Sequence, residues 1–172
     1  MTLDPLTLHV ASALLALATG AILYILPRKG NAWHRRLGIL SAFGLFVTGA
    51  TGLMLYGLTG GFNFLHILSL VTLVSVSFGL FALVRWRRTR NPAWLIAHYR
   101  SMSGAYTGLL IALALRILPS LLGGEMREMI LPATIVLLIL AQGSVQLLDR
   151  LIWRPTYGGA AKRERYAPSQ RL

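Results

Sequence analysis

The chain alternates between long apolar runs and short polar connections. The apolar runs cover residues 6–26, 33–58, 62–84, 92–118 and 129–148. Each is about 20 residues or longer, the length that an α-helix needs to cross a bilayer core of about 30 Å. Pro27 and Pro119 follow two of the runs, and Pro92 opens another at a position favoured in the first helical turn. The pattern predicts an all-α integral membrane protein with five transmembrane helices, the fourth ending before Pro119.

The connections between these runs are too short to hold a soluble domain. We therefore expect one five-helix transmembrane domain over residues 1–153 and a mobile, basic cytoplasmic tail over residues 154–172. The first run does not have the features of a cleavable signal peptide, because it is preceded by Asp4 and by no Lys or Arg.

The composition agrees with a membrane location. Hydrophobic residues make up 55% of the chain and charged residues 13%, and the mean hydropathy is +0.63. Soluble domains contain about 25% charged residues. A net charge of +12 in a soluble protein would indicate nucleic acid as a partner. Here the apolar content points to the lipid bilayer as the partner, with no nucleic acid.

The basic residues are distributed unevenly between the two sides of the predicted membrane. Of the 17 Lys and Arg residues, all but Arg116 and Arg127 lie near the connections after the first and third runs or at the C-terminal end. Cytoplasmic connections carry the excess of Lys and Arg in membrane proteins. The N-terminus is therefore predicted outside and the C-terminus in the cytoplasm, in a bacterial inner (cytoplasmic) membrane.

The histidines are the main candidates for chemistry. The chain has no Cys, which excludes disulfides, thiolate metal sites and a cysteine nucleophile. The first four predicted helices carry one His each: His9 and His66 at the outer level, and His34 and His98 at the inner level. Ionisable residues within spans are costly and usually functional. Two imidazoles that face each other across a bundle suit bis-His ligation of haem iron.

This arrangement predicts two haem b groups, one at each level, in a four-helix core bundle. The fifth helix has no His and is predicted to be peripheral. An alternative is that each His only forms hydrogen bonds near an interface. Zinc is less favoured, because two His per level leave Zn²⁺ short of its usual three or four protein ligands. A cofactor-free accessory subunit of a larger membrane complex and a His-dependent proton or metal transporter remain alternatives, although a transporter normally needs acids within its spans.

Two glycines are expected on the His-bearing helix faces. Gly20 follows His9 by eleven residues and Gly52 follows His34 by eighteen, spacings that return to nearly the same face at about 100° per residue. A glycine at the other level would let a haem pass a helix that does not ligate it. Close helix packing is the alternative reason for both glycines.

Four arginines are candidates to bind haem propionates. Arg116 follows His98 by eighteen residues, so it is expected at the outer level, pointing into the bundle. A buried Arg needs an anion, and a propionate would supply one. The alternative is that Arg116 snorkels and pairs with Glu125 or Glu128. At the inner level the candidates are Arg35, Arg36 and Arg100.

The chain resembles two groups of known proteins. Residues 34–38 (His-Arg-Arg-Leu-Gly), 91–92 (Asn-Pro), 98–102 (His-Tyr-Arg-Ser-Met) and 115–118 (Leu-Arg-Ile-Leu) resemble an uncharacterised bacterial family of predicted multi-span membrane proteins. That resemblance covers the middle half of the chain and implies no established activity.

The layout of the four His resembles the cytochrome b561 architecture. The resemblance is one of topology and implies two b haems, transmembrane electron transfer and a membrane oxidoreductase activity. Ascorbate, quinol, ferric chelates and superoxide are the partners that it implies. This chain departs from that family by using its first four helices, where the family often has a helix before the ligating set.

The charge asymmetry makes a topological prediction. A reporter that is active only in the cytoplasm should be active when fused to the C-terminus and inactive when fused after Gly60, because the two positions are expected on opposite sides. Enzyme activity of the two fusions in intact cells is the measurement. An inactive C-terminal fusion together with an active Gly60 fusion would show that the orientation is the opposite of the predicted one.

Overall fold

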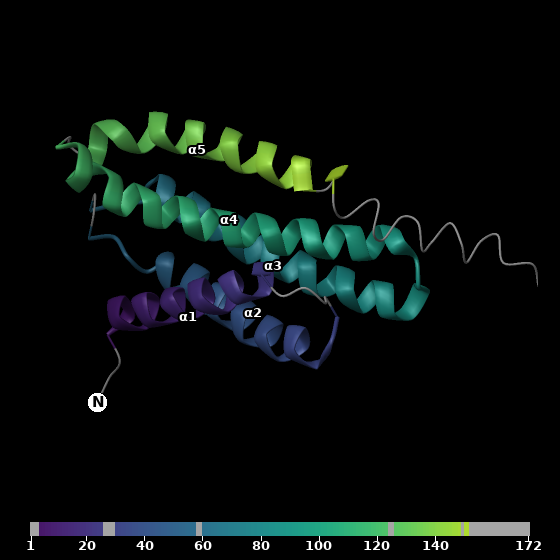
Figure 1. Cartoon of the computed structure of the whole chain (residues 1–172). Helices are drawn as coiled ribbons and strands as arrows, with labels where there is room; N and C mark the ends of the chain where they lie inside the picture. Colours follow the sequence, from purple (N-terminus) through teal and green to yellow (C-terminus); the bar gives the residue numbers. More distant parts are fainter. Residues whose placement is uncertain (1–3, 26–29, 58–59, 124–125, 149, 152–172) are drawn as a thin grey trace, which may run out of the picture.

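The protein is all-helical throughout the part of the chain that the structure describes. The structure is a computed structural model that describes residues 4–25, 30–57, 60–123, 126–148 and 150–151. Within these residues there are five helices and no strand (Figure 1). They are α1 (Pro5–Ile25), α2 (Ala32–Gly52), α3 (Phe64–Thr89), α4 (Pro92–Leu122) and α5 (Met126–Leu148). The predicted tail, residues 154–172, lies outside the described residues.

Asparagine side chains begin three of the helices. Asn31 Oδ1 accepts the backbone N–H of His34 at 2.8 Å. Asn63 and Asn91 accept backbone N–H groups in the same way at the starts of α3 and α4. Each asparagine thereby satisfies one of the donors that the first turn of a helix leaves without an intrahelical partner.

Two helix ends differ from the prediction. α2 ends at Gly52, before the end of the apolar run, and the chain turns through residues 53–57. The expectation that the fourth helix ends before Pro119 is wrong, because α4 continues to Leu122 and stops at Gly123, which adopts φ 69°. Proline removes only one backbone donor, and helices in membrane proteins tolerate that loss. A glycine in the left-handed region is a common helix terminator.

Three of the helices are long and apolar enough to cross a membrane: Pro5–Ile25, Phe64–Thr89 and Pro92–Leu118. In α2 the apolar sequence is diluted by Arg35, Arg36 and several glycines. The apolar part of α5, Pro132–Leu147, is shorter.

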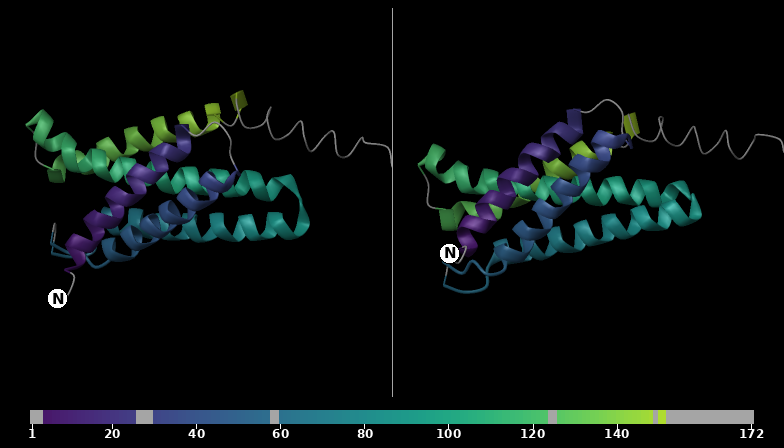
Figure 2. Two further views of the ribbon diagram at one scale, coloured as in Figure 1. Left: turned by 60° about the horizontal axis from the view of Figure 1, so that its bottom comes forward. Right: turned by 90° about the horizontal axis from the view of Figure 1, so that it is seen from below.

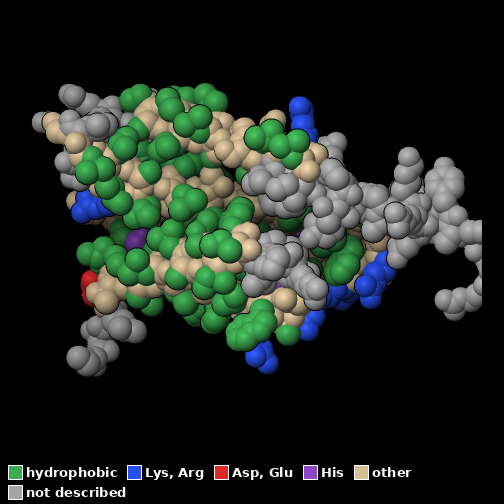
Figure 3. All heavy atoms as spheres, viewed as in Figure 1, with side chains coloured by type: hydrophobic (Ala, Val, Ile, Leu, Met, Phe, Trp, Pro, Cys, Tyr) green, Lys and Arg blue, Asp and Glu red, His purple; other side chains and the backbone are tan. Residues whose placement is uncertain are grey.

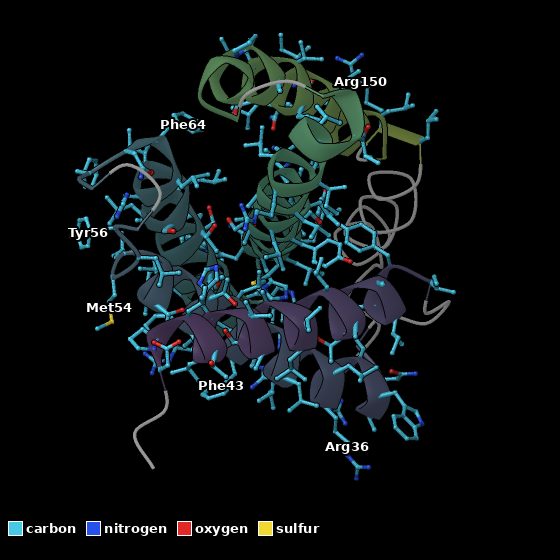
Figure 4. The ribbon with its side chains drawn as sticks, turned by 90° about the vertical axis from the view of Figure 1, so that its left-hand side faces the viewer. Arg36, Phe43, Met54, Tyr56, Phe64 and Arg150 are labelled. Atoms are coloured by element: carbon cyan, nitrogen blue, oxygen red, sulfur yellow. The ribbon has the colours of Figure 1, made fainter. Side chains whose placement is uncertain are left out.

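Large apolar side chains are exposed along all five helices, which makes the outer surface compatible with contact to a lipid bilayer (Figure 3). Phe43, for example, is 62% exposed and points away from the bundle (Figure 4). The prediction of an all-helical protein with an apolar, membrane-compatible surface is confirmed.

The first four helices close a ring, and the fifth lies outside it. α1 packs against α2, α2 against α3, α3 against α4, and α4 back against α1, whereas α5 packs against α4 (Figures 1 and 2). Successive helices run in opposite directions along the ring. The core of the ring draws on all four helices and consists of Ala16, Ala42, Leu45, Val76, Ala105 and Leu109.

Small residues let the helix backbones approach closely. A Cβ added at Gly44 of α2 would lie 2.9 Å from the carbonyl oxygen of Ser12 and 3.1 Å from Cβ of Ala16 on α1. A Cβ added at Gly49 would lie 2.9 Å from Leu73 on α3. Glycine at these contacts brings helices together, as is common in membrane proteins.

Tyr106 joins α4 to α1 across the ring. Its ring covers Gly20, where an added Cβ would clash with the aromatic carbons. Its hydroxyl donates a hydrogen bond to the carbonyl oxygen of Leu17 at 3.1 Å, and the Tyr24 ring lies 5.3 Å away, centroid to centroid. In this structure Gly20 therefore serves helix packing.

Replacing Gly20 with Leu tests that packing. The new side chain would collide with the Tyr106 ring, so we expect Gly20→Leu to destabilise the bundle by about 1–3 kcal/mol, as overpacking of a core typically does. Thermal unfolding of the purified protein in detergent measures the effect. Gly38→Leu is the matched control, because nothing lies within 4 Å of a Cβ at Gly38. Equal melting temperatures for the two variants would contradict the assignment.

Candidate histidine site

His9 is held by a hydroxyl on the neighbouring helix. Its Nδ1 lies 3.1 Å from Thr51 Oγ1. The Thr51 hydroxyl donates its own proton to the carbonyl oxygen of Val47 at 2.7 Å, and in that arrangement it accepts from His9. With this donor pattern a neutral His9 ring carries its proton on Nδ1 and keeps a lone pair on Nε2.

The first three helices meet beside His9. Ser12 Oγ donates to the carbonyl oxygen of His9 at 3.0 Å, which leaves the Thr48 hydroxyl as the donor in the 2.9 Å bond between Thr48 and Ser12. A Cβ added at Gly52 would clash with Ser69 Oγ on α3 and lie 3.4 Å from Cε1 of His9. Gly52 thus lets α1 and α3 approach the same point of α2.

His66 lies one turn before Ser69, near the same end of the bundle as His9. It is 1% exposed. Its Nδ1 accepts the backbone N–H of Asn63 at 3.1 Å, and the Asn63 side chain accepts from the first turn of α3, which completes a capping box. His66 Nε2 is buried and has no hydrogen-bond partner among the described residues. An unsatisfied buried donor costs about 1–3 kcal/mol.

His98 is bound to α3 near the opposite end of the bundle. Its Nδ1 lies 2.8 Å from the carbonyl oxygen of Gly79. A carbonyl only accepts, so His98 carries its proton on Nδ1 and keeps a lone pair on Nε2. Met102, one turn further along α4, packs against Gly79, where an added Cβ would lie 2.9 Å from the Met102 sulfur.

His34 lies in the first turn of α2 and is half-buried. Because neighbouring helices run in opposite directions, His9 and His66 fall near one end of the bundle, and His34 and His98 near the other (Figure 1). No hydrogen bond joins His9 and His66 through His66 Nε2.

The arginines lie on the surface. Arg116 is exposed, which corrects the expectation that it points into the bundle. The preceding residue, Leu115, is 4% exposed and occupies the inward position, and the next side chain on a helix points about 100° away. Arg35 is exposed and donates to the carbonyl oxygen of Gly30 at 3.1 Å.

Arg36 and Arg100 are also exposed, and Arg36 points away from the bundle (Figure 4). The sites of the two predicted clearance glycines are filled by protein side chains: the Tyr106 ring covers Gly20, and Ser69 covers Gly52.

The residues that orient the histidines were not predicted from the sequence. Thr51 and Gly79 lie far from His9 and His98 along the chain, so no local pattern pairs them. Asn63 could have been found, because an Asn followed three residues later by a polar side chain resembles a capping box, with His66 in place of the usual Glu or Gln.

Comparison of the chain with protein-family models, curated proteins and solved structures finds no significant match.

The hydrogen bond between His9 and Thr51 predicts a mutational effect. Thr51→Val keeps the side-chain shape but removes the acceptor for His9 Nδ1–H, so we expect a loss of about 1–3 kcal/mol. Thermal unfolding of the purified protein is the measurement. Thr19→Val is the control, because the Thr19 hydroxyl bonds to carbonyl oxygens of its own helix. A loss no larger than that of the control would show that the interhelical bond contributes nothing.

Proposed function

We propose that this protein is a di-haem b cytochrome that transfers electrons across a bacterial inner membrane. In this proposal all five helices span the bilayer, α2 and α5 included, with the N-terminus outside and the C-terminus in the cytoplasm. The exposed apolar surface of every helix supports a membrane location. The excess of Lys and Arg at one end supports the orientation.

The observation that carries the proposal is that two histidines form a hydrogen bond with a protein oxygen through Nδ1. His9 and His98 each donate Nδ1–H to a protein oxygen, Thr51 Oγ1 in one case and the Gly79 carbonyl in the other. Histidines that bind metals almost always donate their other ring N–H in this way, which fixes the ring and raises the basicity of the ligating nitrogen. His9 and His98 lie near opposite ends of the bundle, so there is one such imidazole at each level.

The residues of the chain have defined roles in this proposal. His9 and His98 would hold the two haem b groups, and Thr51 and Gly79 would orient their rings. Haem b supplies a reversible one-electron couple of iron. The apolar core shared by α1 to α4 keeps water out of the interior, which influences the reduction potential.

The fit of the residues to haem is partial. Within the described residues no three His, Cys, Asp or Glu side chains are grouped to hold a metal ion. A metal at His9 or His98 would thus need ligands from another source, and a porphyrin provides them. His66 in its present hydrogen-bonding state does not fit, because its Nε2 has no lone pair to offer. Gly20 and Gly52 do not provide open space either, since Tyr106 and Ser69 pack against them.

A cofactor-free structural or accessory subunit is the second candidate. It is favoured by the observation that His9, His66 and His98 all have protein partners at Nδ1. Under this alternative the histidines act as interhelical or capping hydrogen-bonding groups and the glycines serve packing alone.

The visible absorption spectrum separates the two candidates. With sufficient haem supply, the purified protein should show b-type bands that sharpen on reduction with dithionite. We expect His9→Ala to lose the haem at one level and His98→Ala to lose the haem at the other. Thr7→Val, an exposed substitution near the start of α1, should keep the wild-type spectrum. A colourless wild-type protein would refute the cytochrome proposal and favour the structural subunit.

A further inference from the structure

The hydrogen bonds of His66 determine which of its nitrogens carries the proton. The backbone N–H of Asn63 can only donate, so His66 Nδ1, at 3.1 Å, must accept and must present its lone pair there. A neutral imidazole then carries its proton on Nε2.

The tautomer of His66 is thus the opposite of that of His9 and His98. Those two donate from Nδ1 and keep a lone pair on Nε2, whereas His66 accepts at Nδ1 and carries a proton on Nε2. The difference arises from position in the helix. His66 is the third residue of α3, within reach of the cap, and the other two face a neighbouring helix.

The surroundings of His66 hold its ring in this state. The Phe62 ring stacks on it at 5.0 Å between centroids, and the Tyr56 ring lies at 4.8 Å. Figure 4 shows Tyr56 at the edge of the bundle, near the start of α3. Rotation of the imidazole by half a turn would place a carbon against the N–H of Asn63 and break the capping box.

We infer that His66 positions the start of α3 by accepting the N–H of Asn63 at Nδ1, and that its buried Nε2–H is a donor whose partner is an oxygen acceptor and not a metal ion. A carbonyl or carboxylate oxygen and an internal water have the required chemistry. For the outer level this inference rests on the proposed function: His9 is then the sole protein ligand of the outer haem iron.

Nitrogen NMR of the protein without haem tests the inference directly. Wild-type protein with ¹⁵N-labelled histidine, in detergent at alkaline pH, should show His66 as the Nε2–H tautomer and His9 and His98 as the Nδ1–H tautomer. Spectra of the His→Gln variants at each position assign the signals. An Nδ1–H signal for His66 would overturn the inference, whether or not the protein binds haem.

Glutamine at position 66 tests the role in the loaded protein. The Gln side chain can accept the N–H of Asn63, as it does in an ordinary capping box, but it is a poor iron ligand. We expect His66→Gln to keep the wild-type melting temperature, haem content and spectrum, and His66→Ala to lower the melting temperature. His9→Gln is the matched control and should lose the outer haem.

The two proposals fail in different ways. Loss of the outer haem in His66→Gln, or conversion of a low-spin outer haem to a high-spin one, would show that His66 ligates iron and would overturn the inference while supporting the cytochrome. A colourless wild-type protein would refute the cytochrome, and the tautomer measured by NMR would still decide the role of His66.

Discussion

The close approach of α1 and α2 at Gly44 is the constraint on which the rest of the site depends. Any side chain at this position would collide with the Ser12 carbonyl and with Ala16. Only at this separation can the short side chain of Ser12 reach Thr48, and His9 reach Thr51. The same approach orders the first half of the ring, against which α3 and α4 pack.

Hydrogen bonding in an apolar interior determines the chemical character of each histidine. A protein partner at Nδ1 is present for three of the histidines, and its chemistry decides whether that nitrogen donates or accepts. The Thr51 hydroxyl donates to its own helix, so His9 acts as the hydrogen-bond donor to it. The Gly79 carbonyl can only accept, so His98 is also a donor. A backbone N–H assigns the opposite role to His66. Three chemically identical side chains thereby take two tautomers: His9 and His98 carry the proton on Nδ1, and His66 carries it on Nε2.

Helix packing occupies the space in front of the glycines that the sequence suggests as clearance for a haem. Gly20 lies on the inward face of α1, as its spacing from His9 predicts, but the Tyr106 ring of α4 fills the space in front of it. The hydroxyl of Tyr106 then binds the backbone of α1 and closes the ring of four helices. The mutational prediction for Gly20 and the haem spectra therefore address separate properties of the molecule, stability in the first case and ligation in the second.

The sequence alone determined the helical class, the apolar exterior, and the placing of one His on each of the first four helices, because apolar run length and helical spacing are local properties. It could not determine that α4 continues through Pro119 or that Leu115, not Arg116, faces inward, since packing against neighbouring helices decides both. The proton positions on His9 and His98 were likewise decided by the tertiary structure. The acceptors for His9 and His98 come from α2 and α3, and only the fold brings those oxygens within 3.1 Å and 2.8 Å of the imidazole nitrogens.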